Sequence, residues 1–313
     1  MSRTAEILVG IDGSAASMHA LDWAAQEARA HGLGLRLVCG YALPSFAVAS
    51  LDGGYAALDD SAIRAGAQAV VDDAAARVEG AGMPVSSHVM VGDAAAVLID
   101  ESARVQLAVV GTRGGGGFAE RLLGTVSSAL PAHAHCPTIV VPMKKHAKGA
   151  PPEEETPAVR PVQRVVVGVD GSPQAELALR WAIREAKVWD AELLAVTGVP
   201  LAASTGALAW LPAAIDHDQV LSDVAAALDV QIDRVAAGEP GSPAVKRQVL
   251  DGTGAQLLTE FSTATDLLVV GSRGRGGFAG VLLGSTSQAV LHHAQCPVMV
   301  ITQRSVLETA GQR

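Results

Sequence analysis

The chain has 313 residues, which is enough for two domains. Of these residues 49% are hydrophobic and 18% are charged, a composition typical of a packed globular protein that excludes a disulfide scaffold and a disordered chain. Its net charge of −9 and its small aromatic content, 3% of the residues, exclude nucleic acid and membrane surfaces as expected partners. Three cysteines, no leader-like N-terminus and no long apolar run predict a cytoplasmic protein.

Short β-branched runs alternate with alanine-rich stretches along the first half of the chain. We expect strands near 6–11, 34–40, 84–91, 106–111 and 138–142, and helices near 15–31, 59–80, 94–103 and 125–133. Apolar strands separated by helices are typical of a parallel sheet covered on both faces. Two long gaps, 41–58 and its counterpart 200–214, are candidate lids or interaction surfaces.

The first expected strand ends in a short acidic turn. Asp12 is followed by Gly13 and Ser14 just before a helix should begin. Ligands of open α/β sheets bind at the carboxyl ends of the strands, which makes Asp12 a candidate ligand contact. Aspartate, glycine and serine also form turns and cap helices, so a purely structural role stays open.

A glycine-rich segment follows the fourth expected strand. It begins at Gly111 and ends at Gly124-Thr125, where the next helix should start, and it contains Arg113 and Arg121. Glycine amides can surround phosphate oxygens, and a helix N-terminus adds free N–H groups and a favourable dipole. The segment therefore predicts a phosphate-binding site.

Two better-known phosphate motifs do not account for this segment. Gly114-x-Gly116-x-x-Ala119 matches the loose dinucleotide fingerprint, but that fingerprint belongs after the first strand of its unit. The P-loop is also excluded, because no lysine separates Gly124 from Thr125.

The second half of the chain repeats the first. Asp12 and its motif return at Asp170, 158 positions later, and the segment that begins at Gly111 returns at Gly271, 160 positions later. A flexible linker that binds nothing would have no reason to recur with its spacing preserved.

Two domains of similar length follow from this repeat. We place the first at residues 1–143 and the second at 163–304. Residues 144–162 are charged and proline-rich, which predicts a linker.

These motifs together carry a family resemblance. The pattern Gly-x2-Gly-x9-Gly-Ser/Thr, with the strand-one Val-Gly-x-Asp-Gly-Ser and a terminal Cys-Pro-x-x-Val-Val, resembles the ATP-binding universal stress protein family in its tandem, actinobacterial-like form. The resemblance implies two Rossmann-like (flavodoxin-like) α/β domains, each an open five-stranded parallel sheet of order 3-2-1-4-5 with helices on both faces. It also implies ATP and Mg²⁺ as cofactors and a homodimer formed by sheet-edge pairing.

The resemblance further implies one ATP site in each half. Asp12 and Asp170 would contact the ribose or an associated metal, Gly40 and Gly198 would meet adenine, and the glycine segments would hold the phosphates. The candidate residues of the first half are Gly10, Asp12, Gly40, Val110, Gly111, Arg113, Gly114, Gly115, Gly116, Gly117, Arg121, Gly124, Thr125, Val126 and Ser127. Those of the second half are Gly168, Asp170, Gly198, Val270, Gly271, Arg273, Gly274, Arg275, Gly276, Gly277, Gly284, Ser285, Thr286 and Ser287.

The two sites are not expected to be identical. Arg121 of the first half faces Val281 in the second. If Arg121 contacts phosphate, the two halves hold their nucleotides differently.

Histidines lie near two of the cysteines and raise the possibility of a zinc site or a Cys-His nucleophile. The first half has His133, His135 and Cys136. The second half has a different spacing, in which Gln295 replaces His135 and precedes Cys296. Each cysteine precedes a proline that enters a strand, where it would be a small buried hydrophobe. We therefore predict no metal-ligating and no catalytic residue here.

The expected function is that of an ATP-binding regulator of stress response or growth arrest. An ATP-consuming enzyme, either a weak ATPase or a nucleotidyl transferase, and a nucleotide-free interaction module are the alternatives. No carboxylate or glutamine is placed beside the glycine segment to position water, so hydrolysis is expected to be slow at most.

Overall fold

The computed structural model describes residues 3–42, 60–112, 123–143, 159–200, 216–276 and 282–305. Its contacts divide into two units, Met1–Val159 and Arg160–Arg313, which are described separately below. Residues 43–58 and 201–214 of the two expected lids and residues 144–158 of the expected linker lie outside the described residues.

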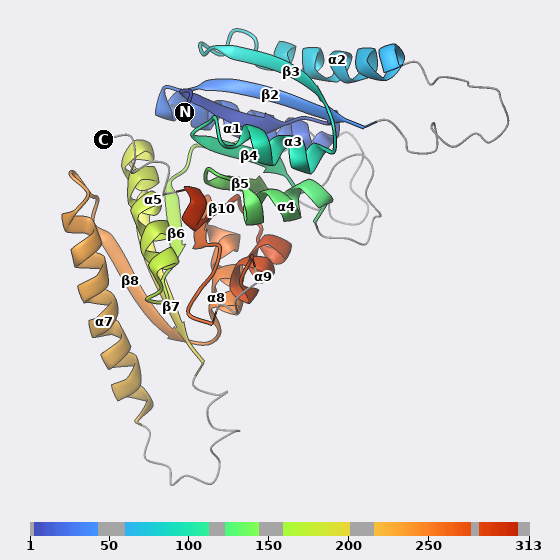
Figure 1. Ribbon diagram of the computed structural model, residues 1–313. Coiled ribbons are helices and arrows are strands. Elements are labelled where there is room, and N and C mark those ends of the chain that lie inside the picture. The colour runs from blue at the N-terminus through green and yellow to red at the C-terminus, as the bar shows by residue number, and fades with distance from the viewer. Residues whose placement is uncertain are drawn as a thin grey trace, which may run out of the picture. The chain divides into compact units, whose positions relative to one another are not determined.

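The first unit contains an open parallel sheet of strand order β3-β2-β1-β4-β5, as predicted (Figure 1). Every expected strand and helix of this half is present, with ends within about three residues of the prediction. Its elements are β1 (Glu6–Gly10), α1 (Ala15–His31), β2 (Gly34–Tyr41), α2 (Asp60–Arg77), β3 (Val85–Val91), α3 (Ala94–Glu101), β4 (Leu107–Gly111), α4 (Thr125–His133) and β5 (Thr138–Val141).

The second unit has the same topology, with strand order β8-β7-β6-β9-β10. A 3-10 turn after α8 is added to the order of the first unit. Its elements are β6 (Arg164–Gly168), α5 (Pro173–Trp189), β7 (Glu192–Val199), α7 (His217–Ala237), β8 (Val245–Asp251), α8 (Gly254–Phe261), η2 (Ser262–Ala264), β9 (Leu267–Gly271), α9 (Ser285–His293) and β10 (Val298–Ile301).

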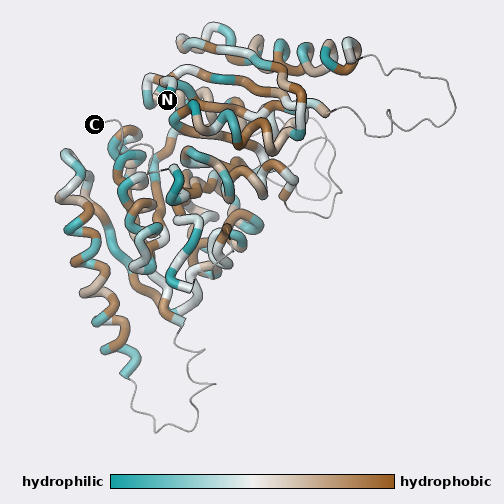
Figure 2. Tube along the Cα trace, in the orientation of Figure 1, coloured by the Kyte–Doolittle hydropathy of each residue, from teal (hydrophilic) through white to brown (hydrophobic). Residues whose placement is uncertain are grey.

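The central strands are apolar on both faces because helices cover both sides of each sheet. Ile7, Leu8 and Val9 of β1 are all fully buried, and Val165, Val166 and Val167 of β6 are as well. Figure 2 shows these strands as continuous hydrophobic segments, whereas the helices alternate between polar and apolar stretches. Such continuous runs are typical of parallel sheets. Within the described residues, no helix combines the length and apolar character needed to cross a membrane.

Each first strand turns into its helix through a glycine that takes a left-handed conformation. Gly13 has φ +76° and Gly171 has φ +81°, a conformation that other residues rarely adopt. The next residue caps the helix, since Ser14 accepts a hydrogen bond from the Ser17 amide and Ser172 accepts one from the Ala175 amide. The aspartate before each glycine is thereby fixed at the carboxyl end of the sheet.

A buried serine at the end of α3 fixes the far end of α4. The Ser102 hydroxyl donates to the carbonyl oxygen of Ile99 at 2.6 Å and accepts from the His135 amide at 2.9 Å. Ser262 repeats both bonds in the second unit, with the Thr259 carbonyl at 2.6 Å and the Gln295 amide at 3.0 Å. Helices α4 and α9 begin at the candidate sites. These serines therefore stabilise the two helices whose first turns border the sites.

The replacement Ser102→Ala should lower the free energy of unfolding by about 1–3 kcal/mol, because it leaves the His135 amide without its acceptor. Ser128→Ala is the matched control, since the Ser128 hydroxyl bonds the Gly124 carbonyl at an exposed position; its effect should stay within about 0.5 kcal/mol. Urea unfolding of the three proteins checks this. Equal midpoints for the parent and Ser102→Ala would contradict the role given to this hydroxyl.

Candidate functional site

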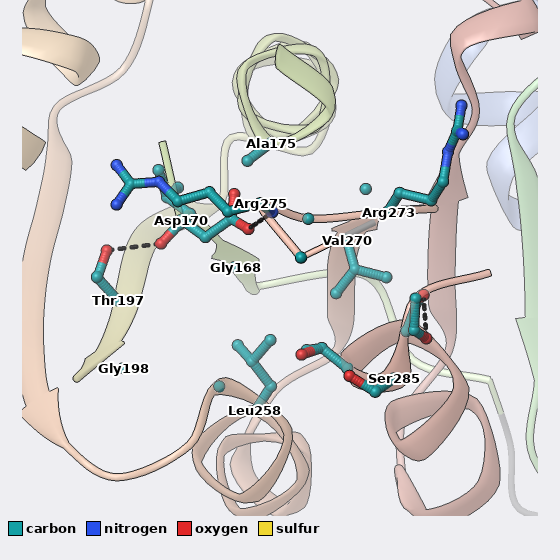
Figure 3. Close-up of a pocket in the computed structure, with 18 of the residues that line it drawn as sticks. Gly168, Asp170, Ala175, Thr197, Gly198, Leu258, Val270, Arg273, Arg275 and Ser285 are labelled. Atoms are coloured by element: carbon teal, nitrogen blue, oxygen red, sulfur yellow. Dashed lines mark hydrogen bonds between the residues drawn. The ribbon is translucent and has the colours of Figure 1, made fainter. Parts of the chain in front are cut away.

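A cavity of about 690 Å³ opens at the carboxyl ends of β6, β7 and β9 in the second unit (Figure 3). This size is within the range of small-molecule sites. Among the candidate residues of the second half, only Gly277 lies outside the described residues. The others all line this cavity: Gly168, Asp170, Gly198, Val270, Gly271, Arg273, Gly274, Arg275, Gly276, Gly284, Ser285, Thr286 and Ser287.

A backbone hydrogen bond closes the glycine segment into a loop. The Gly284 amide donates to the Ser272 carbonyl at 2.7 Å, and the Ser272 amide in turn donates to Ile301 of β10 at 2.8 Å. In the first half the Gly124 amide donates to the Thr112 carbonyl at 2.9 Å. Each loop therefore returns to the strand from which it leaves, and the next helix begins beside the carboxyl ends of the strands.

Asp170 connects this loop to the turn after β6. One carboxylate oxygen accepts from the Ser172 amide at 2.9 Å, and the other accepts from the Arg275 amide at 3.0 Å. A Cβ atom on Gly274 would lie only 2.3 Å from the second oxygen, so the loop can approach Asp170 only as glycine. Asp170 thus has the structural role left open by its sequence and at the same time lines the cavity.

Asp12 makes the equivalent turn in the first half. Its carboxylate accepts from the Ser14 amide at 3.0 Å and from the Ser14 hydroxyl at 2.6 Å. The Cys39 side chain is buried nearby, and its pKa is raised by desolvation and by the negative charge of Asp12. Cys39 occupies the position that Thr197, which lines the cavity, has in the second half.

The hydroxyl groups at the start of α9 divide into two kinds. Ser285 is exposed and Thr286 is half-buried, and both line the cavity beside the free amides of the first helical turn. The Ser287 hydroxyl instead lies 3.0 Å from the Ser272 carbonyl, and that of Ser127 lies 2.7 Å from the Thr112 carbonyl. The latter two hydroxyls therefore tie the helix to the loop.

Two arginines of the loop have no carboxylate partner. Neither Arg273 nor Arg275 forms an ion pair with another residue in the described ranges. Eight other described arginines are paired with carboxylates within 4.0 Å, namely Arg36, Arg77, Arg104, Arg164, Arg180, Arg184, Arg234 and Arg247, whereas Arg29, Arg64, Arg160 and Arg304 share the lack of a described ion pair. The cavity is thus bordered by two cationic groups that are available to an anionic ligand.

Part of the cavity lining is apolar or neutral and was not identified from the sequence. Val224 of α7 and Leu258 of α8 supply apolar surface, and Thr197 lies at the end of β7. Gln288 also lines the cavity, so the expectation that no glutamine lies beside the glycine loop is wrong for this half. Its position four residues after Gly284, on the helix that leaves the loop, was the available signal.

The described candidates of the first half lie at the corresponding edge of their own sheet. Gly10, Gly40 and Gly111 lie at the carboxyl ends of β1, β2 and β4, and the start of α4 follows the loop. Strand β2 continues to Tyr41, one residue beyond Gly40. Six candidates fall outside the described residues: Arg113, Gly114, Gly115, Gly116, Gly117 and Arg121.

Several candidate glycines are required by packing rather than by a ligand. A Cβ atom on Gly10 would lie 2.8 Å from Leu98 of α3, and one on Gly168 would lie 2.7 Å from Leu258 of α8. On Gly111 it would lie 2.5 Å from the Ala16 carbonyl oxygen. These positions let the helices approach the strand ends closely.

The cysteines near the histidines are buried packing residues. Cys136 is fully buried and Cys296 is 3% exposed. Burial raises the pKa of the Cys296 thiol to about 12, so at neutral pH the group is not the thiolate that metal ligation or nucleophilic attack requires. Their position agrees with the interpretation as small hydrophobes.

Comparisons with known proteins match this architecture. The sequence profile of the Universal stress protein family matches residues 4–142 and again residues 161–302. Universal stress protein Rv2623 of Mycobacterium tuberculosis is 35% identical over 306 residues, which cover 94% of this chain and 95% of that protein. Universal stress protein Rv1996 of the same organism is 34% identical over 316 residues, with 94% of each chain covered.

Solved structures agree on the fold. A universal stress protein from Archaeoglobus fulgidus superimposes with a TM-score of 0.67 at 22% sequence identity, covering 96% of this chain and 99% of that one. At this identity the likeness supports the fold alone.

Gly198→Ala should reduce the free energy of unfolding by about 1–3 kcal/mol, because its Cβ atom would lie 2.8 Å from the Gly252 carbonyl oxygen and 2.9 Å from the Gly254 amide nitrogen. Gly276→Ala is the matched control within the same cavity, since nothing lies within 4 Å of its added atom. Thermal unfolding of both variants measures the difference. An equal melting temperature for the two would disprove the close approach of α8 to β7.

The raised pKa of Cys296 predicts a distinct alkylation profile. Because burial raises the pKa of Cys296 to about 12, the thiol stays protonated near pH 8, so iodoacetamide should modify it very slowly in the folded protein, with a rate that increases as the pH rises. Peptide mass spectrometry after timed alkylation gives the rate, and the urea-unfolded chain is the control. An alkylation rate of Cys296 that stopped rising below pH 9 in the folded protein would refute the raised pKa.

Proposed function

Because the chain belongs to the universal stress protein family, we propose that it is a stress-response regulator that binds one ATP in each half. The cavity of the second half carries this proposal, since its loop arginines have no carboxylate partner among the described residues of a chain of net charge −9. Unpaired guanidinium groups at a glycine loop favour a phosphorylated ligand. The family relationship alone does not specify which nucleotide is bound.

The loop and the start of α9 would hold the phosphate groups. The amides of Arg273, Gly274 and Gly276 and of the first turn of α9 are available donors on this side of the cavity, and the hydroxyls of Ser285 and Thr286 lie beside them. A helix N-terminus also favours negative charge through its dipole. We place the phosphates here and give no such role to the Ser287 hydroxyl.

The apolar part of the cavity would hold the adenosine. Val224, Leu258 and Val196 give it an apolar floor, and Gly198 lets backbone atoms approach the base. Asp170 lies between this floor and the loop, where its remaining lone pairs can accept a ribose hydroxyl.

The residues present fit a Mg²⁺ ion that is bound mainly through the nucleotide. Mg²⁺ at phosphate sites takes one or two carboxylates and keeps several waters. Asp170 is the carboxylate that lines the cavity. Mg²⁺ would neutralise phosphate charge there, and Asp170 would orient the ion while it holds the loop.

We assign the protein a binding role rather than efficient turnover. Gln288 could orient a water, but among the described residues that line the cavity there is no second carboxylate to act as a base. Hydrolysis, if it occurs, should be slow compared with nucleotide exchange. Phosphate release in single-turnover reactions measures it, and turnover above about 1 s⁻¹ would favour the enzyme alternative.

Calorimetric titration of nucleotide-free protein with Mg²⁺ and ATP tests the proposal, together with mass identification of any nucleotide released on denaturation. Gly274→Ala should weaken binding in the second half by at least about tenfold, because its Cβ atom would displace Asp170. Gly66→Ala in α2 is the control, since nothing lies within 4 Å of its added atom.

Two binding sites in the parent, with one weakened in Gly274→Ala, support one ATP per half. No detectable binding in the parent would refute the proposal. Two unaffected sites in a folded Gly274→Ala protein would refute the placement of the second site.

A further inference from the structure

We propose that the second-half site selects nucleotides that carry a phosphate on a ribose hydroxyl in addition to their 5′-phosphates, and that Arg275 recognises this extra phosphate. The inference rests on the proposed function, because it takes the 5′-phosphates to lie at the start of α9. Arg275 is then a specificity-determining residue of that site.

The backbone of Arg275 is held at the sugar side of the cavity. Its amide donates to Asp170 at 3.0 Å, which fixes the arginine at the turn between β6 and α5. Asp170 in turn accepts from Ser172 at 2.9 Å. This arrangement places the arginine at a defined point instead of leaving it on an untethered loop.

The guanidinium group lies directly on the bare backbone of Gly171. A Cβ atom on Gly171 would come within 2.9 Å of the guanidinium carbon of Arg275 and within 3.1 Å of its Nε. The φ of +81° requires glycine at this position, and the exposed Arg275 side chain covers the space that a Cβ atom would fill. The side chain is thus packed against the turn that ends in Asp170.

The guanidinium group keeps its hydrogen-bond donors. Within the part of the chain that the structure describes, Arg275 has no ion pair, and both carboxylate oxygens of Asp170 accept backbone amides. A planar guanidinium presents two parallel N–H groups that match a phosphate. The free donors of Arg275 are therefore suited to an anionic group rather than to the neutral hydroxyls of an unmodified ribose.

Figure 3 separates this arginine from the place proposed for the 5′-phosphates. Arg275 extends beside Asp170 toward Thr197, Ser285 lies across the cavity, and Arg273 leaves the loop in the opposite direction. A nucleotide with its 5′-phosphates at Ser285 has its sugar between these two sides. In dinucleotide-binding sheets an arginine at the ribose edge accommodates a 2′-phosphate in the same way.

The first half of the chain offers a natural comparison. Gly115 stands at the position equivalent to Arg275, so no side chain is present there to bind a ribose phosphate. The first half carries Arg121 instead, where the second has Val281. The two halves should therefore prefer different nucleotides although they share one loop pattern.

The test compares 5′-AMP with adenosine 3′,5′-bisphosphate and adenosine 2′,5′-bisphosphate on the full chain. Hydrogen exchange of peptides that cover residues 267–290 and 107–130 reports binding to each half separately during the titration. In the second half we expect at least one bisphosphate to bind about tenfold more tightly than 5′-AMP. In the first half the ratio of the bisphosphate affinity to the 5′-AMP affinity should stay near one.

Arg275→Gln is the informative variant, because it removes the charge and keeps the backbone amide that bonds Asp170. It should bring the ratio in the second half to within about twofold of one. Arg273→Gln is its matched control, which removes an arginine from the same loop but from the opposite side. This variant should weaken all three nucleotides alike and keep the ratio.

The outcomes separate this inference from the proposed function. A parent that binds neither ATP nor 5′-AMP overturns the proposed function. A parent that binds ATP with a ratio near one in the second half, or a preference that survives Arg275→Gln, overturns the role of Arg275 and leaves the ATP site standing. The reciprocal variant Gly115→Arg should give the first half a preference for the bisphosphate. If neither Arg275→Gln nor Gly115→Arg changed the affinity ratio of its own half, that result would also overturn the inference.

Discussion

A single backbone hydrogen bond in each half determines where the candidate site can form. The Gly284 amide bonds the Ser272 carbonyl, and Gly124 bonds Thr112 in the same manner. Because one end of each loop follows a strand and the other precedes a helix, this bond holds both ends of the loop at the carboxyl edge of the sheet. The free amides of α9, the carboxylate of Asp170 and the two loop arginines then border one cavity.

The fold could be predicted because its signals are local and occur twice. Runs such as Ile7–Val9 and Val165–Val167 are apolar at every position, which separates a doubly covered parallel strand from an alternating antiparallel one. The constant spacing between the copies fixed the number of domains before any contact was known. The ends of the strands were less certain, as β2 continues one residue past Gly40, because strand ends depend on pairing with neighbours.

The composition of the site could be predicted, but the direction of its side chains could not. Glycine, aspartate and hydroxyl residues identify the loop, yet nothing in the sequence separates Ser285, which is exposed, from Ser287, which is buried against the Ser272 carbonyl. Val224 was missed because helix α7 follows a long segment without regular signals and reaches the cavity only through tertiary packing. Arg275 was identified as a contact, but its packing on Gly171 depends on the bond to Asp170.

The charges beside the cavity and the net charge of the chain favour different kinds of anionic ligand. At physiological ionic strength the Debye length is about 8 Å, so a ligand in the cavity experiences mainly the charges that border it, which are two guanidinium groups and the carboxylate of Asp170. A mononucleotide is short enough to enter this local positive field completely. A nucleic acid strand would also extend over the remaining surface of a chain of net charge −9 and be repelled there. A net charge of −9 therefore disfavours a polyanion more strongly than a small free anion.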